Sequence, residues 1–176
     1  MKSKSEIRRE VLHHRDQLPV DLRKTWSQEI VNHIQNNSHY QQAHVIAMYY
    51  HMGSEVDVLP LLCDTSKQFV FPKIVNRDSK VIRFAPIVNS VVPGIFNTME
   101  PDGDIIDNSL IDLFLVPVVA FTIKGERIGY GAGYYDRLLS MVHVPRIGIA
   151  YMTQIIDEIP VEPHDVLLHQ IIVNNQ

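Results

Sequence analysis

The amino-acid sequence predicts an α/β fold with a mostly parallel, Rossmann-like sheet flanked by helices, in a single domain over residues 1–176. Two observations support this prediction. Segments rich in β-branched and aromatic residues alternate along the chain with segments of helical periodicity, an order that is typical of parallel sheets. Several of the strand-like segments are apolar at nearly every position, as expected for strands that are covered on both faces.

Two helices are expected near the N-terminus, over residues 5–16 and 21–36. In the second, apolar residues recur every four positions from Leu22 to Ile34 and form one stripe, which is the pattern of an amphipathic helix. A proline and then Asp21 interrupt the pattern between the two segments. Asp21 is therefore the predicted N-cap of the second helix.

Strand-like segments recur through the rest of the chain. The predicted strands are residues 45–50, 69–73, 81–87, 113–119, 145–151 and 169–174. Between them, residues 56–62 and 134–142 have the composition of short helices. Residues 88–109 lack periodicity and contain two prolines and two glycines, so they predict a long loop. Long loops in compact domains are commonly functional.

Composition narrows the classes of function. The formal net charge is −4 and no long basic run is present, which argues against a non-specific nucleic-acid surface. Cys63 is the single cysteine, so no internal disulfide can form, and a reducing, cytoplasmic compartment is expected. The longest apolar segment, residues 113–121, is too short to span a membrane. The nine histidines follow no metal-binding spacing.

The most distinctive segment is Gly-Glu-Arg-Ile-Gly-Tyr-Gly-Ala-Gly-Tyr-Tyr-Asp-Arg, residues 125–137, between the apolar strand and a predicted helix. Glycine allows positive φ and lets a ligand approach the backbone, so successive N–H groups can bind an anion such as phosphate. Ligands of α/β sheets bind at this end of the strands. The segment lacks the Gly-Lys-Ser/Thr end of a P-loop and the spacing of a dinucleotide fingerprint.

A purely structural interpretation of this segment stays open. In that interpretation the glycines form a flexible turn, and Tyr134 and Tyr135 pack in the core. The charged residues beside the glycines, Arg127, Asp136 and Arg137, favour a binding site instead.

The same segment resembles the signature of the 5-formyltetrahydrofolate cyclo-ligase family, Gly-x-Arg-Leu/Ile-Gly-x-Gly-x-Gly-Tyr-Tyr-Asp, and the match runs from Gly125 to Leu138. Other parts of the chain fall in the family's order: Lys4 with Arg8, and residues 49–57, 71–73, 100–101, 148–154 and 159–165. Three positions depart from it. His169 stands where many members carry aspartate, Ala132 where some carry lysine, and Tyr130 where some carry arginine.

The resemblance implies an activity. Members of the family close 5-formyltetrahydrofolate to 5,10-methenyltetrahydrofolate and hydrolyse ATP to ADP and phosphate, through a phosphorylated formyl intermediate, an imidoyl phosphate. The implied partners are ATP and 5-formyltetrahydrofolate, with Mg²⁺ as cofactor; a monomer without nucleic-acid or membrane partners is expected. Two other classes stay open: a sugar-phosphate or thioester enzyme on a similar sheet, and a non-catalytic nucleotide- or folate-binding module.

The resemblance also implies the site residues. The ATP-binding residues would be Lys4, Arg8, Arg127, Ile128, Gly129, Tyr130, Gly131, Ala132, Gly133, Tyr134 and Tyr135. The folate-binding residues would be Tyr50, Glu55, Tyr130, Gly131, Ala132, Gly133 and Tyr134. Carboxylates suit Mg²⁺, and the metal ligands would be Asp136 and Asp165.

The chemistry of these residues also allows plainer roles. Lys4 and Arg8, at i and i+4, share one side of the first helix, where cations oppose the helix dipole unless an anion lies nearby; a solvated basic tail is the alternative. Glu55 suits an aminopyrimidine edge because it can accept two hydrogen bonds, but it also suits a helix N-terminus. Tyr50 can be a core aromatic, and the two aspartates can be a first-turn acid and a turn former.

Overall fold

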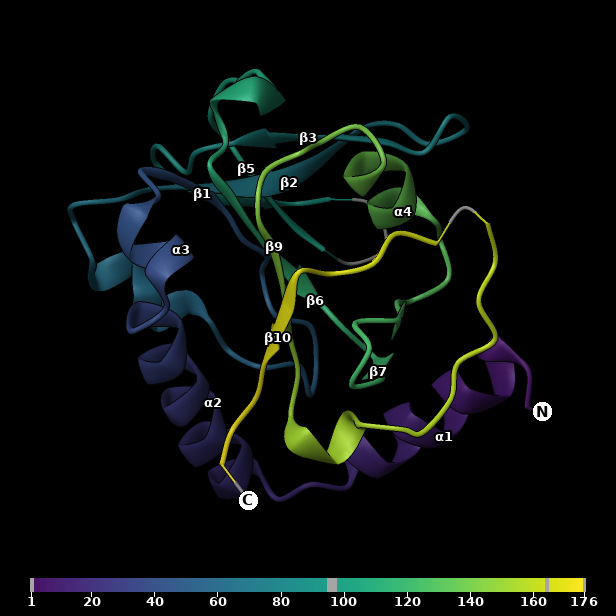
Figure 1. Ribbon diagram of the computed structural model, residues 1–176. Coiled ribbons are helices and arrows are strands. Elements are labelled where there is room, and N and C mark those ends of the chain that lie inside the picture. Colours follow the sequence, from purple (N-terminus) through teal and green to yellow (C-terminus); the bar gives the residue numbers. More distant parts are fainter. Residues whose placement is uncertain (1, 95–97, 164, 176) are drawn as a thin grey trace.

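The computed structural model describes residues 2–94, 98–163 and 165–175. At its centre is a six-stranded sheet with the order β10-β9-β6-β1-β2-β3 (Figure 1). Its strands are β1 Val45–Ala47, β2 Gln68–Asn76, β3 Val81–Ala85, β6 Leu113–Pro117, β9 Arg146–Ile149 and β10 Gln170–Ile172. Neighbouring strands run parallel except β2 and β3, which are antiparallel. The predicted α/β fold with a mostly parallel sheet is confirmed.

The strand order marks where a ligand can bind. Numbered along the chain within this sheet, the order is 3-2-1-4-5-6 from β3 to β10, which is the order of a doubly wound Rossmann sheet. The direction in which strands are added reverses between β1 and β6, which are hydrogen-bonded neighbours. At such a point the connections leave in opposite directions, and a crevice opens beyond the carboxyl ends of the two strands.

The N-terminal helices begin and end close to their predicted bounds. The first, α1 (Lys4–Asp16), begins after Ser3, whose side chain accepts from the backbone in a capping box. The second, α2 (Val20–Gln35), begins after Pro19 without a side-chain cap, so the prediction of Asp21 as N-cap is wrong; Asp21 lies in the first turn. The other α-helices are α3 Ser38–Gln42 and α4 Tyr134–Leu139. Within the described ranges, no helix is long and apolar enough to cross a membrane.

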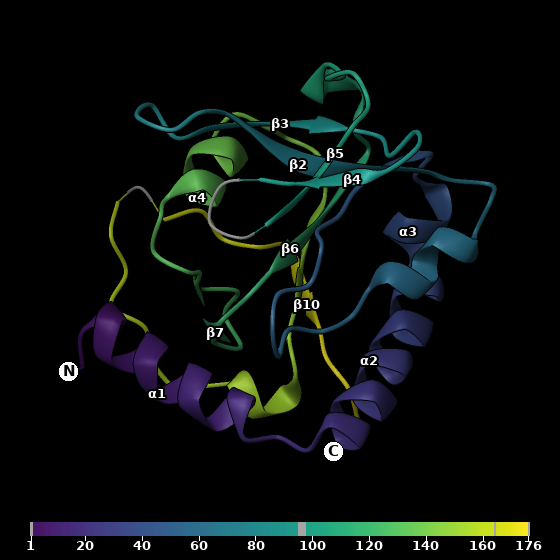
Figure 2. The same cartoon turned by 180° about the vertical axis from the view of Figure 1, so that it is seen from behind.

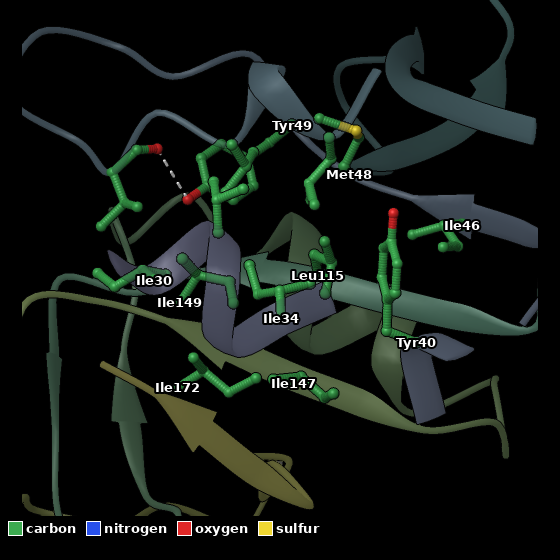
Figure 3. Close-up of a cluster of buried hydrophobic side chains, with 14 of the residues drawn as sticks. Ile30, Ile34, Tyr40, Ile46, Met48, Tyr49, Leu115, Ile147, Ile149 and Ile172 are labelled. Carbon is green, nitrogen blue, oxygen red and sulfur yellow. Dashed lines mark hydrogen bonds between the residues drawn. The ribbon is translucent and has the colours of Figure 1, made fainter. Parts of the chain in front are cut away.

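Helices cover both faces of the sheet (Figures 1 and 2). Helices α2 and α3 lie on one face, where Ile34 and Leu115 belong to the same buried cluster (Figure 3). Helix α4 lies on the other face, where Leu138 packs in a second cluster with Phe114. Residues 113–116 of β6 are accordingly all buried, which explains why this strand is apolar at every position rather than at alternate ones.

Helix α1 lies across the end of the sheet instead of covering a face (Figure 1). Its Ile7 and Val11 form a third buried cluster with residues of β7 (Ala120–Phe121) and β8 (Arg127–Ile128). These two strands pair as a small antiparallel hairpin, which was not predicted. The hairpin follows the carboxyl end of β6 directly, so it brings α1 to the edge of the sheet where the crevice lies.

The predicted long loop at 88–109 is only partly a loop. Strands β4 (Val91–Pro93) and β5 (Met99–Pro101) pair antiparallel inside it, and β5 packs against β2 (Figure 2). Residues 95–97 lie outside the described part of the chain. Helix α3 was not predicted either. Three further elements are shorter than predicted. The strand predicted at 45–50 ends at Ala47, and the helix predicted at 134–142 ends at Leu139. A 3₁₀ helix over Leu59–Cys63 stands in place of the helix predicted at 56–62.

Candidate active site

A cavity of about 780 Å³ opens at the carboxyl ends of the central strands. Pro117 at the end of β6 forms part of its wall, together with the first turns of α1, strand β2, the edge strand β3 and the glycine segment. Both its position and its size are those of a small-molecule site in an α/β protein. The predicted residues that line it are Lys4, Arg8, Arg127, Ile128, Gly129, Tyr130, Gly131, Ala132, Gly133, Tyr134, Tyr135, Asp136 and Asp165.

The glycine segment forms the loop between β8 and α4. Gly131 and Gly133 have φ of +89° and +76°, the left-handed region that favours glycine. The carbonyl of Gly129 accepts a hydrogen bond from Arg8 Nε at 2.7 Å, so α1 is tied to the loop. A Cβ on Gly131 would lie 3.0 Å from the Arg8 guanidinium carbon. The absence of a side chain at this position is therefore what lets Arg8 lie against the loop.

Gly125 has a different role from the other three glycines. Its N–H donates to Thr122 in the turn between β7 and β8, and it does not line the cavity. With φ of +83°, a Cβ there would lie 2.8 Å from the carbonyl oxygen of Leu168. Gly125 belongs to the same glycine-rich segment of the sequence, but it precedes β8 and the other three glycines follow it.

Arg127 holds the two ends of the loop together. Its side chain is only 4% exposed and donates from Nη2 to Asp136 Oδ1 at 2.7 Å. A second nitrogen, Nη1, donates to the carbonyl of Val166 at 2.7 Å. Arg127 therefore fixes the position of Asp136 and also joins the loop to the segment that precedes β10. Its guanidinium has structural partners in addition to its place in the cavity wall.

The first turn of α1 lies beside the segment before β10 (Figure 1), and Lys4 belongs to this turn. Its ammonium contacts the Asp165 carboxylate at 2.6 and 2.8 Å and Glu162 at 2.7 Å. Partial burial alone lowers the pKa of Lys4, but the hydrogen bonds that its ammonium donates to the two carboxylates, together with their negative charge, outweigh burial and raise the pKa. The interpretation of Lys4 as a solvated tail is wrong, because anions offset the helix dipole here. His164, between these acids in sequence, lies outside the described residues.

Glu55 and Tyr50 do not form part of the cavity wall. Glu55 is only 7% exposed and accepts a hydrogen bond from Met52 N at 2.7 Å, and the Tyr130 hydroxyl lies near its carboxylate. Burial raises the pKa of Glu55 despite these contacts. The Tyr50 ring packs 4.7 Å from Phe71, which agrees with the core-aromatic interpretation. Tyr130 thus separates Glu55 from the cavity.

Several cavity residues were missed by the sequence analysis. Met52, Pro72 and Glu100 lie in segments that resemble the family but were given no role, and Lys80 lies in no such segment. Arg15 supports the site from behind: Nη2 donates to the Tyr130 hydroxyl at 2.8 Å although the residue is only 4% exposed. The sequence contains a signal for Arg15. Ile7, Val11 and Arg15 follow one another every four positions on the buried side of α1, and a charged residue in such a stripe is unusual.

The two aspartates provide a donor set that suits a hard cation. Asp136 and Asp165 line the same cavity, and both keep part of their side-chain surface exposed. Carboxylate oxygens are the ligands that Mg²⁺ takes from proteins, usually one or two beside phosphate oxygens. In the described part of the chain no group of three or more metal-ligating side chains occurs. The two aspartates therefore fit a metal ion whose remaining coordination positions are filled by phosphate oxygens of a bound ligand.

The fold and the cavity define a class of protein: a doubly wound α/β protein with a glycine-rich loop and four cationic side chains in a cavity at its switch point. The sequence matches the model of the 5-formyltetrahydrofolate cyclo-ligase family over residues 1–174, and the chain belongs to that family. The predicted family and the prediction of an enzyme of this class are confirmed.

Known relatives match between about three quarters and nearly all of the chain. The 5-formyltetrahydrofolate cyclo-ligase of Haemophilus influenzae is 27% identical over 97% of each chain, and that of Mycoplasma pneumoniae is 33% identical over 74% of this chain and 73% of the relative. The solved structure of Aquifex aeolicus 5,10-methenyltetrahydrofolate synthetase superposes with a TM-score of 0.86 at 30% identity, covering 97% of this chain and 89% of that one.

Proposed function

We propose that this protein closes 5-formyltetrahydrofolate to 5,10-methenyltetrahydrofolate at the expense of ATP, which becomes ADP and phosphate. Family membership supports the overall reaction. One structural observation carries the assignment of the site. A single cavity gathers the glycine loop, the cations of α1 and two carboxylates, although these groups lie up to about 160 positions apart in the chain, as the Lys4–Asp165 contact illustrates.

The chemistry explains why such a site is needed. The N5-formyl group is an amide, and its oxygen is a poor leaving group. Transfer of the γ-phosphoryl group to that oxygen breaks the bond to ADP and gives an imidoyl phosphate. N10 then attacks the formyl carbon and loses its proton, the C–O bond breaks, and phosphate departs. Catalysis is therefore mostly positioning and charge neutralisation, as in other phosphoryl transfers.

The loop residues and α1 are proposed to bind ATP. Backbone N–H groups between Ile128 and Tyr135 would face the phosphates, because the glycines leave the backbone uncovered. Lys4 and Arg8 would supply positive charge from the same wall. Asp136 and Asp165 would hold Mg²⁺, which supplies neutralisation of phosphate charge when bound. A cation there would compete with the present ion pairs to Arg127 and Lys4.

The folate is proposed to bind beside the loop, against Tyr130 to Tyr134. Glu55 would accept hydrogen bonds from the aminopyrimidine edge of the pterin. Its carboxylate accepts from Met52 N and lies near the Tyr130 hydroxyl, so the pterin would have to displace Tyr130 to reach it. Tyr130 is 40% exposed, which leaves room for its ring to move. Tyr50 would serve as a more distant support through its contact with Phe71.

The test is to mix purified protein with 5-formyltetrahydrofolate and MgATP, and to follow the methenyl chromophore and ADP together. Equal rates of both, dependent on Mg²⁺, are the expected result. ADP without chromophore would point to another acceptor, and binding of ATP without either product would point to a non-catalytic module. Asp136→Asn should remove Mg²⁺-dependent turnover from a folded protein; near-normal turnover in that variant would contradict the metal-ligand role.

Assembly and compartment are part of the same proposal. We expect the enzyme to act as a monomer in the cytoplasm. The single cysteine supports a reducing compartment. Light scattering coupled to size exclusion tests the first expectation, since a monomer has a mass of 20.2 kDa.

A further inference from the structure

Lys80 occupies an unusual backbone position in the turn between β2 and β3. Among the described residues it is the one non-glycine residue with positive φ, at 53°. Its N–H donates to Arg77 at 3.3 Å, which closes the turn. A Cβ is unfavourable in this conformation, and glycine or asparagine is the usual choice. A lysine here is a strained choice, and such residues are often found where function requires them.

The Lys80 side chain extends from this turn to the glycine loop. Its Nζ lies 3.4 Å, and its Cδ 3.7 Å, from the point where a Cβ on Gly133 would be. Lys80 also lines the cavity. The lack of a side chain on Gly133 therefore opens the space into which the ammonium projects. Two segments more than fifty positions apart meet at this point, as Lys80 and Gly133 show.

Among the cationic side chains of the cavity wall that the structure describes, Lys80 is the one without a hydrogen bond or ion pair to another described residue. Lys4 contacts two carboxylates, Arg8 donates to a loop carbonyl, and Arg127 donates to a carboxylate and a carbonyl. Within residues 2–94, 98–163 and 165–175, by contrast, the Lys80 ammonium makes no hydrogen bond and no ion pair. The loop from Ile128 to Tyr135 carries no cationic side chain of its own. A cation that acts on this part of the loop must therefore come from another element.

We propose that Lys80 is an ATP-binding residue, which contacts the nucleotide phosphates above the Gly133 end of the loop. This assignment rests on the proposed function, in which the loop holds ATP. A lysine suits the role because its flexible stem carries a compact charge that can follow phosphate oxygens. The left-handed backbone at Lys80 directs that stem across the β2–β3 edge, and the missing partner leaves the ammonium able to bind an anion.

The test separates charge from turn conformation by using three variants. Lys80→Gln removes the charge and keeps the strained turn, Lys80→Gly removes the charge and relieves the turn, and Lys80→Arg keeps the charge. Calorimetric titration with MgATP gives the dissociation constant, and thermal unfolding gives the stability. We expect both neutral variants to weaken MgATP binding about tenfold, with Lys80→Arg within about twofold. Lys80→Gly should nevertheless unfold at a temperature no lower than the wild type.

Two controls make the outcomes distinct. Lys124→Gln removes an exposed lysine from the β7–β8 turn, outside the cavity, and should leave binding unchanged. Arg8→Gln removes a cation that already contacts the loop, and should weaken binding. If Arg8→Gln weakens MgATP binding and Lys80→Gln does not, the Lys80 assignment is overturned while the loop site stands. If neither does, the placement of ATP on the loop fails and the assignment falls with it. If Lys80→Gly binds MgATP with wild-type affinity while Lys80→Gln binds weakly, the conformation of the turn and not the charge controls binding. That result would also overturn the Lys80 assignment.

Discussion

Alanine in place of Gly131 tests whether the glycine loop is shaped by its contact with Arg8. The substitution changes one atom in a loop that lies at the surface of the cavity. Gly131 has φ of +89°, and the added Cβ would lie 3.0 Å from both the guanidinium carbon and Nη2 of Arg8. The Arg8 guanidinium is the end of a flexible side chain, so it can move away from the added Cβ. It must then release the Gly129 carbonyl, to which Nε donates at 2.7 Å.

The magnitude follows from two contributions. A non-glycine residue in left-handed backbone costs about 1–2 kcal/mol. Loss of the Arg8 hydrogen bond adds about 0.5–1.5 kcal/mol, because Arg8 is partly exposed and water replaces part of the interaction. The expected fall in the free energy of unfolding for Gly131→Ala is therefore roughly 1.5–3.5 kcal/mol.

Urea unfolding followed by circular dichroism measures this loss. Gly129→Ala is the matched control: it lies two positions away in the same loop, its φ is not positive, and a Cβ there meets nothing within 4 Å. That variant should stay within about 0.5 kcal/mol of the wild type. In an Arg8→Ala background, Gly131→Ala should cost about 0.5–1.5 kcal/mol less, since the clash is gone. Equal losses at Gly129 and Gly131, or strict additivity with Arg8→Ala, would refute the reasoning.

Three further predictions concern buried groups. Arg127→Lys cannot reach both Asp136 and a backbone carbonyl with separate nitrogens, so unfolding by urea should show a loss of about 1.5–3 kcal/mol; a loss below about 0.5 kcal/mol would contradict the two-armed contact. Burial raises the pKa of Glu55 above 4.5, so the folded state favours the protonated carboxyl. The contribution of this group to the free energy of unfolding is therefore fully present below pH 4.5 and is lost as the pH rises through the folded-state pKa. Glu55→Gln, which stays neutral, should therefore unfold at a higher temperature than the wild type near pH 8, with the gap closing on acidification; a gap that widens toward acid would be inconsistent with this sign. In β9, a Cβ on Gly148 would lie 2.5 Å from Leu168 Cδ1, so Gly148→Ala should cost about 1–3 kcal/mol in unfolding free energy, part of which Leu168→Ala in the same chain should restore.

Much of the fold was predictable because its signals are local. The strand over Leu113–Pro117 is apolar at every position and is buried on both faces. In α2 the second half of the predicted stripe, Ile30 and Ile34, is buried, whereas Leu22 is exposed. The glycine loop and the Lys4–Arg8 pair could also be identified, because their spacing is short. Elements of two or three residues, such as β7 and β8, could not be identified, because so few positions carry no periodicity.

What only the tertiary structure decided is which local features meet. The sequence by itself determined a parallel α/β sheet, a glycine loop after an apolar strand, and the residue types of an anion site. Packing decided that Arg8 contacts Gly129, 121 positions away, that Tyr130 separates Glu55 from the cavity, and that Lys80 reaches the loop while Gly125 does not line it. The physical reason is that backbone propensity and side-chain periodicity depend on near neighbours, whereas these contacts depend on strand order and on how α1 packs against the β7–β8 hairpin.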